Sequence, residues 1–168
     1  MTAQPDPSLP SQLRPSGRVQ LSCQWERFSV ISAEIRPMME RQQAEVGKDY
    51  EPYDPDWDRY FAFDRAGSLR IWTARTIEGF LVGYVFWLLL RSLHASSTRF
   101  ATADLIYLAP EWREGLLGYR FLRSAISAVS ELKPDIIRVE TNDLYEDGRL
   151  GLLLRRLKFR RIGSVYQT

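Results

Sequence analysis

The residues best suited to chemistry lie in one stretch, from Leu105 to Gly118, where an apolar strand runs into a short turn and a helix begins at once. Unpaired backbone N–H groups at a helix start carry roughly half a unit of positive charge, so they can bind a phosphate or pyrophosphate. Gly115 and Gly118 would let the backbone approach the anion closely, and Arg113 can add a charge-assisted contact. The pattern therefore predicts an anion-binding turn over Arg113–Gly118.

Other phosphate-binding motifs fit this turn less well. The chain has no G-x-x-x-x-G-K-[ST] run, which excludes a P-loop. It also has no G-x-G-x-x-G run, and the turn comes late in the chain, which argues against a dinucleotide-binding fold. A plain strand–turn–helix, whose glycines serve only tight packing, is the remaining alternative, and the turn alone does not separate the two.

The rare residue types exclude several other chemistries. Cys23 is the single cysteine and His94 the single histidine, which excludes an internal disulfide and argues against a zinc site. No G-x-S-x-G elbow presents a nucleophilic serine. The net charge of +2, with 45% hydrophobic and 26% charged residues, is ordinary for a globular domain and indicates no particular partner.

The hydrophobic pattern predicts one mixed α/β domain over residues 18–168, built on a largely antiparallel sheet. Residues 1–17, rich in proline and polar residues without an apolar segment, are expected to form a disordered lead-in and not a signal peptide. The longest apolar run, Phe80–Leu90, is too short to span a bilayer and predicts a buried strand. We therefore expect a cytoplasmic protein.

Periodicity gives the order of the elements. The predicted strands are Arg18–Cys23, Leu69–Ala74, Phe80–Leu90, Ala101–Leu108, Ile136–Thr141 and Phe159–Tyr166. The predicted helices are Trp25–Val46 with an interruption near Pro37, a second from about Asp54 to Asp64, Gly118–Val129 and Leu150–Leu157. The second and third strands, joined by a tight turn at Ile77–Gly79, are expected to form a hairpin.

This order and this turn resemble the GNAT superfamily of N-acetyltransferases. The run Leu108–Arg113 is similar to the family's approach to its R/Q-x-x-G-x-G/A signature, and Gly118 matches the last glycine of that signature. Leu153–Phe159 resembles the family's L-Y-E-K-L-G-F segment, and the likeness runs from about residue 18 to the C-terminus. Asp54-Pro55-Asp56-Trp57 and Leu93-His94 further resemble small stand-alone members encoded in phage genomes.

The resemblance implies two parallel strands, Ala101–Leu108 and Ile136–Thr141, that splay apart and hold the pantetheine arm of acetyl-CoA, the co-substrate, between them. Backbone groups of the first strand would pair with the pantetheine amides as an added strand would, and N–H groups of the turn would take the pyrophosphate. No metal is implied. The implied coenzyme contacts are Ile106, Leu108, Arg113, Glu114, Gly115, Leu116, Leu117, Gly118 and Asn142.

Acetyl transfer to an amine requires a deprotonated amine and a polarised carbonyl. By resemblance, the Leu108 N–H polarises the carbonyl and Asp104, near where many members place a carboxylate, is a candidate base. Unperturbed histidine has a pKa near 6.5, which suits a base at neutral pH, so His94 is the other candidate. The simpler alternatives are a solvent-facing acid and a polar loop histidine. Glu140 shares a strand face with Arg138 and is interpreted as half of a structural ion pair.

The chain departs from the family pattern at two positions. The first glycine of the signature falls at Leu116, with Gly115 displaced by one residue, and the tyrosine that often protonates the departing thiolate falls at Leu154. Tyr145, Tyr166 or water are then the candidate acids.

Two charged stretches bear on the partners. Between Glu40 and Asp64 there are eight acidic residues and three basic ones. This excess of negative charge would favour a cationic acceptor, or it marks only a pair of solvated helices. Arg149–Arg161 has six basic residues and no acidic one, and could meet the adenosine 3′-phosphate, a nucleic acid or only water.

The leading prediction is an acetyl-CoA-dependent N-acetyltransferase that acts on a primary amine of a small molecule, peptide or protein. The alternatives are a non-catalytic CoA-binding or interaction module and, less favoured, a nucleic-acid-binding domain. We expect no membrane partner. The predicted final strand could pair two subunits into a homodimer.

Overall fold

The computed structural model describes residues 20–46, 53–140 and 148–162. In chain order its elements are β1 (Ser22–Glu26), α1 (Phe28–Val46), α2 (Trp57–Arg65), β2 (Leu69–Arg75), β3 (Leu81–Arg91), β4 (Arg99–Leu108), the 3-10 turn η1 (Pro110–Trp112), α3 (Leu117–Glu131), β5 (Ile136–Val139) and α4 (Arg149–Arg156). The predicted order is confirmed from the first strand to the last helix. The closing strand predicted over Phe159–Tyr166 is wrong in its described part, because residues 159–162 lack the period-two alternation of a strand and have no regular structure.

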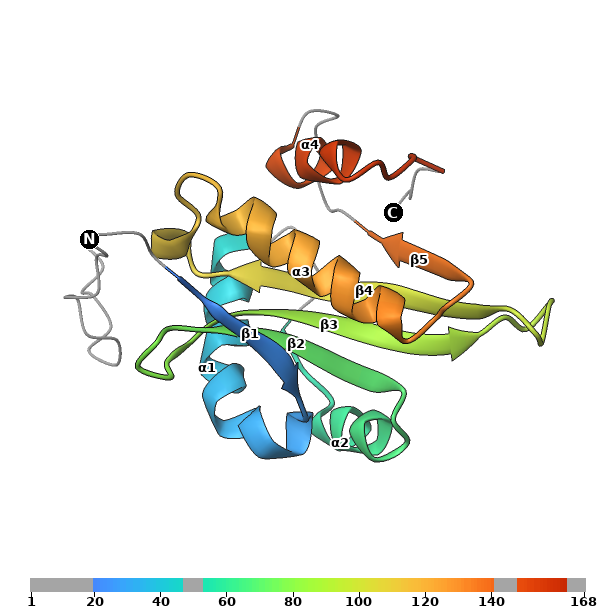
Figure 1. The fold of residues 1–168 in the computed structure, drawn as a ribbon. Helices are drawn as coiled ribbons and strands as arrows, with labels where there is room; N and C mark the ends of the chain where they lie inside the picture. Colours follow the sequence, from blue (N-terminus) through green and yellow to red (C-terminus); the bar gives the residue numbers. More distant parts are fainter. Residues whose placement is uncertain (1–19, 47–52, 141–147, 163–168) are drawn as a thin grey trace.

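The strands form one sheet in the order β1-β2-β3-β4-β5, antiparallel except for the parallel pair of β4 and β5. The predicted mixed, mostly antiparallel α/β fold is therefore confirmed, and so is the β2–β3 hairpin. Helix α3 crosses the front of the sheet, and α1 and α2 lie behind it (Figure 1). None of the described helices has the length and apolarity that a bilayer crossing requires.

The two faces of the sheet are buried by different helices. On one face the rings of Tyr84 and Phe86 in β3 lie 5.1 Å apart, and Phe28 of α1 packs edge-to-face with Phe86, with 6.4 Å between the ring centroids. On the other face the Trp72 indole donates a hydrogen bond of 3.0 Å to Ser124 of α3. These aromatic contacts hold α1 against one face of the sheet and α3 against the other, and Tyr60 of α2 packs 5.9 Å from Phe86 on the α1 face.

Helix α1 is continuous through Pro37, so the predicted interruption is wrong. Proline removes one backbone hydrogen bond from a helix interior. Here Ile31, Ile35 and Met39 form a buried stripe on either side of it, at most 5% exposed. Packing of this stripe against the sheet outweighs the local cost of the proline.

The beginning of α1 is held by a carboxylate from the end of α2. Asp64 accepts hydrogen bonds of 3.3 Å from the backbone N–H groups of Phe28 and Ser29, and its side chain also pairs with Arg27. Burial opposes ionisation of this carboxyl, but the hydrogen bonds from Ser29 and Arg27 outweigh it and lower the pKa of Asp64. Asp64 thus supplies the N-terminal cap that the first turn of α1 lacks.

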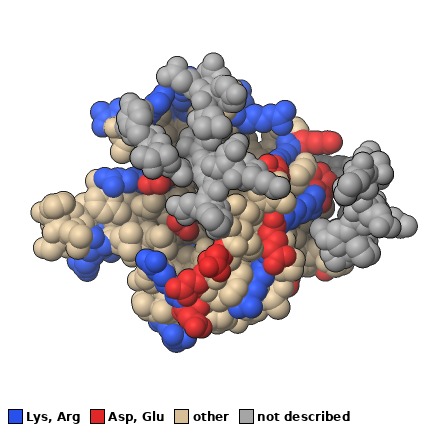
Figure 2. Space-filling view, turned by 180° about the vertical axis from the view of Figure 1, so that it is seen from behind, with Lys and Arg blue, Asp and Glu red and all other residues tan. Residues whose placement is uncertain are grey.

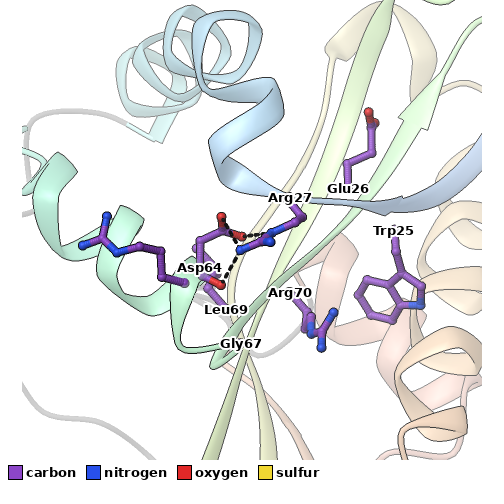
Figure 3. A pocket seen from close by; sticks show the side chains of 8 residues that line it. Trp25, Glu26, Arg27, Asp64, Gly67, Leu69 and Arg70 are labelled. Atoms are coloured by element: carbon purple, nitrogen blue, oxygen red, sulfur yellow. Dashed lines mark hydrogen bonds and ion pairs between the residues drawn. The ribbon is translucent and has the colours of Figure 1, made fainter.

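A pocket of about 370 Å³ opens at this junction (Figure 3). It is lined by Trp25, Glu26, Arg27, Asp64, Arg65, Gly67, Leu69 and Arg70. The Arg27 and Asp64 side chains point toward each other across it, and Glu26 is held by Arg75 at 2.8 Å. The pocket lies at the β1 edge of the sheet, about 14 Å from β4 at the usual strand spacing, and its carboxylates serve structural pairs.

Replacing Asp64 with Asn should lower the free energy of unfolding by about 1–3 kcal/mol at neutral pH, because buried N–H groups lose a charged acceptor. The folded-state pKa of Asp64 is depressed, so its contribution is present above the unfolded pKa and is lost as the pH falls through the folded one. Urea unfolding at pH 7 and near pH 3 should show the difference from the parent shrinking in acid. An equal loss for Asp54→Asn, an exposed control, would contradict this role.

Candidate functional site

Strands β4 and β5 run side by side over only part of their length. Their parallel pairing covers Phe100 to Ala103 of β4 and ends at the pair Ala103–Val139. Beyond this point β4 continues to Leu108, and among the described residues its strand partner there is β3. We call the place where the two strands separate the fork.

The fork coincides with a β-bulge. Phe86 of β3 pairs with Leu105 and Trp87 pairs with Ala103, so Asp104 between them is an extra residue without a partner. A bulge bends its strand and ends regular pairing. Because it follows directly on the last β4–β5 pair, it turns the end of β4 away from β5.

The free edge of β4 beyond the fork offers backbone hydrogen-bonding groups. Ala109 N–H donates to Val82 O at 2.8 Å, so this residue faces β3. Hydrogen bonding alternates along an antiparallel strand, so the N–H and C=O groups of Ile106 and Leu108 face away from β3, toward the gap. These are the two residues predicted to pair with pantetheine.

The turn after β4 leads to a helix start without a side-chain cap. Leu116 is the N-cap residue of α3 and makes no capping hydrogen bond, and the first intrahelical bond runs from Arg120 N–H to Leu116 O. The N–H groups of Gly118 and Tyr119 precede that bond and have no acceptor within the helix. Gly115 adopts a left-handed φ of +60°, which favours glycine.

Open space surrounds this helix start. A Cβ atom built on Gly118 or on Gly115 would meet no heavy atom within 4 Å. Glu114 and Leu116 are exposed, and Leu117 N–H makes a long contact of 3.4 Å to Glu114 O. The predicted anion-binding turn is therefore both uncapped and accessible.

Arg113 points toward α1 and not along the turn. Its Nε donates to Leu108 O at 2.5 Å, and its two terminal nitrogens bind the carboxylate of Glu45, with 2.9 Å between Nη2 and Oε2. The guanidinium also lies 5.3 Å from the ring of Tyr107. The guanidinium of Arg113 is thus bound by other residues of the protein at Nε and at both terminal nitrogens.

A second α1 side chain reaches the free edge of β4. Gln42 donates through Nε2 to Ile106 O at 3.3 Å and accepts through Oε1 from the Tyr84 hydroxyl at 2.5 Å. Burial, and secondarily the nearby Tyr107, raises the pKa of Tyr84, which keeps this hydroxyl a donor. No sequence motif points to Gln42, since its role depends on where α1 packs.

Two carboxylates flank the fork. Asp104 and Glu140 each follow the last parallel pair, one on either strand. Asp104 is an exposed residue, and partial desolvation of its carboxyl, followed by the charge of Glu140, raises the pKa of Asp104. Arg138 lies over the Phe100 ring at 4.2 Å, and the ion pairs between described residues do not include the predicted Arg138–Glu140 pair.

An aromatic wall faces Asp104 from α2. Burial, followed by the charges of Asp104 and Tyr53, raises the pKa of Tyr60 to about 12, so its hydroxyl stays protonated. The Tyr60 ring lies 5.8 Å from the ring of Trp57. The Arg36 guanidinium lies over the Trp57 ring, 4.4 Å from its centroid. The α1–α2 side of the fork therefore combines an aromatic cluster with a hydroxyl donor and a carboxylate.

His94 lies far from the fork. It belongs to the loop between β3 and β4, where its backbone N–H donates to Ser92 Oγ, and it is exposed. Asp104 is five residues along β4 from Arg99, or about 17 Å at 3.4 Å per residue. The structure thus separates the two candidate bases.

Helix α4 covers the region beside the α3 start. Leu154, at the position of the family's tyrosine, is 7% exposed and brings no hydroxyl. Arg156 lies 5.9 Å from the ring of Tyr119, the residue after Gly118. The other predicted residues here, Asn142, Tyr145 and Tyr166, lie outside the described residues.

The acidic stretch near α2 is less concentrated than its sequence suggests. Asp56 caps α2, Asp64 caps α1, and Glu45 binds Arg113. On the face formed by α1 and α2, acidic and basic side chains are interspersed (Figure 2). The carboxylates at the fork are therefore the more specific acidic feature.

No known family profile and no curated protein sequence matches the chain, but solved structures do. A ribosomal-protein-alanine N-acetyltransferase of Brucella melitensis is 17% identical with a TM-score of 0.64, covering 89% of this chain and 98% of its own. A predicted acetyltransferase of Clostridium acetobutylicum with acetyl-CoA is 15% identical, with a TM-score of 0.63 and coverage of 89% and 96%. An aminoglycoside acetyltransferase from a soil metagenomic sample, in complex with sisomicin, is 12% identical, with a TM-score of 0.63 and coverage of 88% and 95%.

These likenesses define the class of fold. The chain has the fold of the GNAT-type N-acetyltransferases, as its sequence pattern predicted. Among these neighbours are one structure with acetyl-CoA and one with an aminoglycoside, so the fold accommodates both a coenzyme and an amine-bearing molecule.

Gly83 of β3 allows the end of β4 to lie unusually close to β3. A Cβ atom at Gly83 would lie 2.8 Å from Leu108 Cδ1 and 2.9 Å from the Tyr107 carbonyl oxygen, which is backbone and cannot turn aside. Gly83→Ala should therefore lower the free energy of unfolding by about 1–3 kcal/mol, measured by urea denaturation. Gly118→Ala, whose Cβ enters open space, is the matched control, and equal stability of both variants would contradict the prediction.

Proposed function

We propose that this chain is an acetyl-CoA-dependent N-acetyltransferase that moves the acetyl group to a primary amine. One observation carries the proposal: the free edge of β4 beyond the fork leads directly to an uncapped, open helix start. A strand edge can pair with the amides of an extended ligand, and a helix start can bind its phosphates. The acetyltransferase folds of the solved neighbours support this assignment.

The coenzyme would lie along this path. Ile106 and Leu108 would bind the pantetheine amides, and the N–H groups between Gly115 and Gly118 would bind the pyrophosphate. The basic flank of α4, where Arg156 contacts Tyr119 beside Gly118, would offer positive charge to the remaining phosphate.

The fork would supply the chemistry. Asp104 accepts a proton from the ammonium form of the acceptor, directly or through a water molecule, and the amine nitrogen then attacks the thioester carbonyl carbon. The Leu108 N–H stabilises the negative charge that develops on the carbonyl oxygen. The C–N bond forms, the C–S bond breaks, and the sulfur takes its proton from solvent, because Leu154 provides none.

The acceptor would enter from the α1–α2 side. Asp104 and Glu140 offer negative charge where the strands separate, and Tyr60 and Trp57 offer flat surface beside them. This combination favours a cationic primary amine, on a small molecule or on a protein terminus or side chain.

The experiment that tests the proposal is a screen of primary amines with purified protein and acetyl-CoA, monitored by release of free thiol. Amine-dependent thiol release at rates well above the protein-free control is expected. Binding of acetyl-CoA without release by any amine would favour a non-catalytic CoA-binding module, and absence of binding would contradict the coenzyme site itself.

Gly118→Leu should weaken acetyl-CoA binding at least tenfold, because its side chain would occupy the space in front of the free N–H groups. The position has open space around it, so the variant should remain folded. Calorimetric titration gives the dissociation constant and circular dichroism the fold. Ser127→Leu, at an exposed position later in α3, is the control, and unchanged affinity of Gly118→Leu would exclude this placement.

Asp104→Asn should reduce kcat by about 10²-fold or more, the usual contribution of a general base. The parent's rate should fall as the pH drops through the raised pKa of Asp104, because the base is then protonated. Glu140→Gln should move this acid limb to lower pH by removing a charge that raises the pKa. A parent-like pH–rate profile in Asp104→Asn would exclude this base, and a profile altered by His94→Ala would shift the role to the β3–β4 loop.

A further inference from the structure

The C-terminal half of α1 binds the segment that follows the fork through three side chains. Arg41 forms a two-pronged pair with Glu111 of η1, with N–O distances of 3.0 and 2.8 Å. Gln42 binds Ile106 O, and Glu45 binds Arg113. The Arg41–Glu111 pair lies outside the proposed coenzyme path. The contacts of Gln42 and Glu45 involve Ile106 and Arg113, which lie on that path.

The Glu45–Arg113 pair uses the recognition edge of the guanidinium. Both terminal nitrogens contact the carboxylate, while Nε donates to Leu108 O. A guanidinium binds carboxylates and phosphates through the same planar fork. An anion that takes this edge of Arg113 with two parallel hydrogen bonds must therefore replace Glu45.

Gln42 and Arg113 together cover the free edge of β4. The Gln42 amide occupies the carbonyl of Ile106, and Arg113 Nε occupies the carbonyl of Leu108. Both carbonyls face the gap. An amide of an extended ligand that paired with this edge would take over these hydrogen bonds.

We propose that Glu45 is a built-in competitor for Arg113, displaced from it by the phosphate groups of the coenzyme, and that Gln42 gives way at the same time on the edge of β4. The proposal rests on the proposed function. The proposal makes α1 a determinant of coenzyme affinity. Glu45 lies 68 positions from Arg113 along the chain, and Gln42 lies 64 positions from Ile106.

The exposure of the pair makes this exchange feasible. The Arg113 side chain is 35% exposed and that of Glu45 38%, so the pair is partly screened by water and its contribution is modest. The neighbouring pair of Arg41 with Glu111 is equally exposed, at 38% and 37%, and joins the same two segments. It provides a matched control of the same chemistry.

The test is calorimetric titration of folded variants with acetyl-CoA. Glu45→Gln should bind about two- to fivefold more tightly than the parent, because an exposed ion pair no longer has to be broken. Glu111→Gln should bind as the parent does. Arg113→Gln combined with Glu45→Gln should lose the gain.

Unchanged or weaker binding by Glu45→Gln, with the parent binding normally, would overturn the competitor role and leave the proposed function standing. A gain of the same size in Glu111→Gln would also overturn it, because loosening of α1 would then be the cause. Absence of acetyl-CoA binding in the parent and in every variant would overturn both the competitor and the coenzyme site.

Discussion

Hydrogen bonding between β4 and β5 stops after the Ala103–Val139 pair, and the bulge at Asp104 begins at that point. The free edge of β4 and the position of the two carboxylates beside it follow from this coincidence. The end of β4 keeps its bonds to β3, and side chains instead of a described strand bind the carbonyls of its other edge. Asp104 and Glu140 directly follow the last pair, one on each strand, and the turn to α3 starts where the free edge ends.

The rest of the fold keeps this edge at its position. On one side Gly83 lets β3 approach Leu108 closely, since any side chain there would meet the β4 backbone. On the other side α1 supplies Gln42 and Glu45, whose contacts hold the segment in its present arrangement. A strand with one unpaired edge is normally exposed to unwanted pairing, and the α1 side chains cover this one.

The sequence predicted the fold and the strand–turn–helix between Leu105 and Gly118 well because both depend on local patterns. Leu69–Arg75 alternates and the α3 stripe repeats every three to four residues, so these elements are visible without their partners. Trp25 was expected in a helix but lies in β1, where it packs 5.1 Å from Trp72 across the strand pair. The contact with Trp72 in the folded protein therefore outweighed the local helical pattern at Trp25.

The site residues were predicted only in part, since their placement depends on long-range register. The bulge at Asp104 arises from pairing with residues of β3, and nothing in the local sequence marks it. The Arg113–Glu45 pair spans 68 positions, so Arg113 was expected to face a ligand and faces α1. The coenzyme contacts and the base stay predictions, as does the likeness to phage-encoded members.

The carboxylate of Asp64 joins the first turn of α1 to the last turn of α2. The two helices are therefore fastened to each other at one end, and that end is remote from the fork. Beyond that carboxylate, the Phe28 ring of α1 packs 6.2 Å from Trp57 and 5.2 Å from Tyr60 of α2, and Arg36 of α1 lies over the Trp57 ring. The two helices are therefore joined along their contact as well as at Asp64, so a displacement of α2 would be transmitted through α1 to Gln42 and Glu45 beside β4.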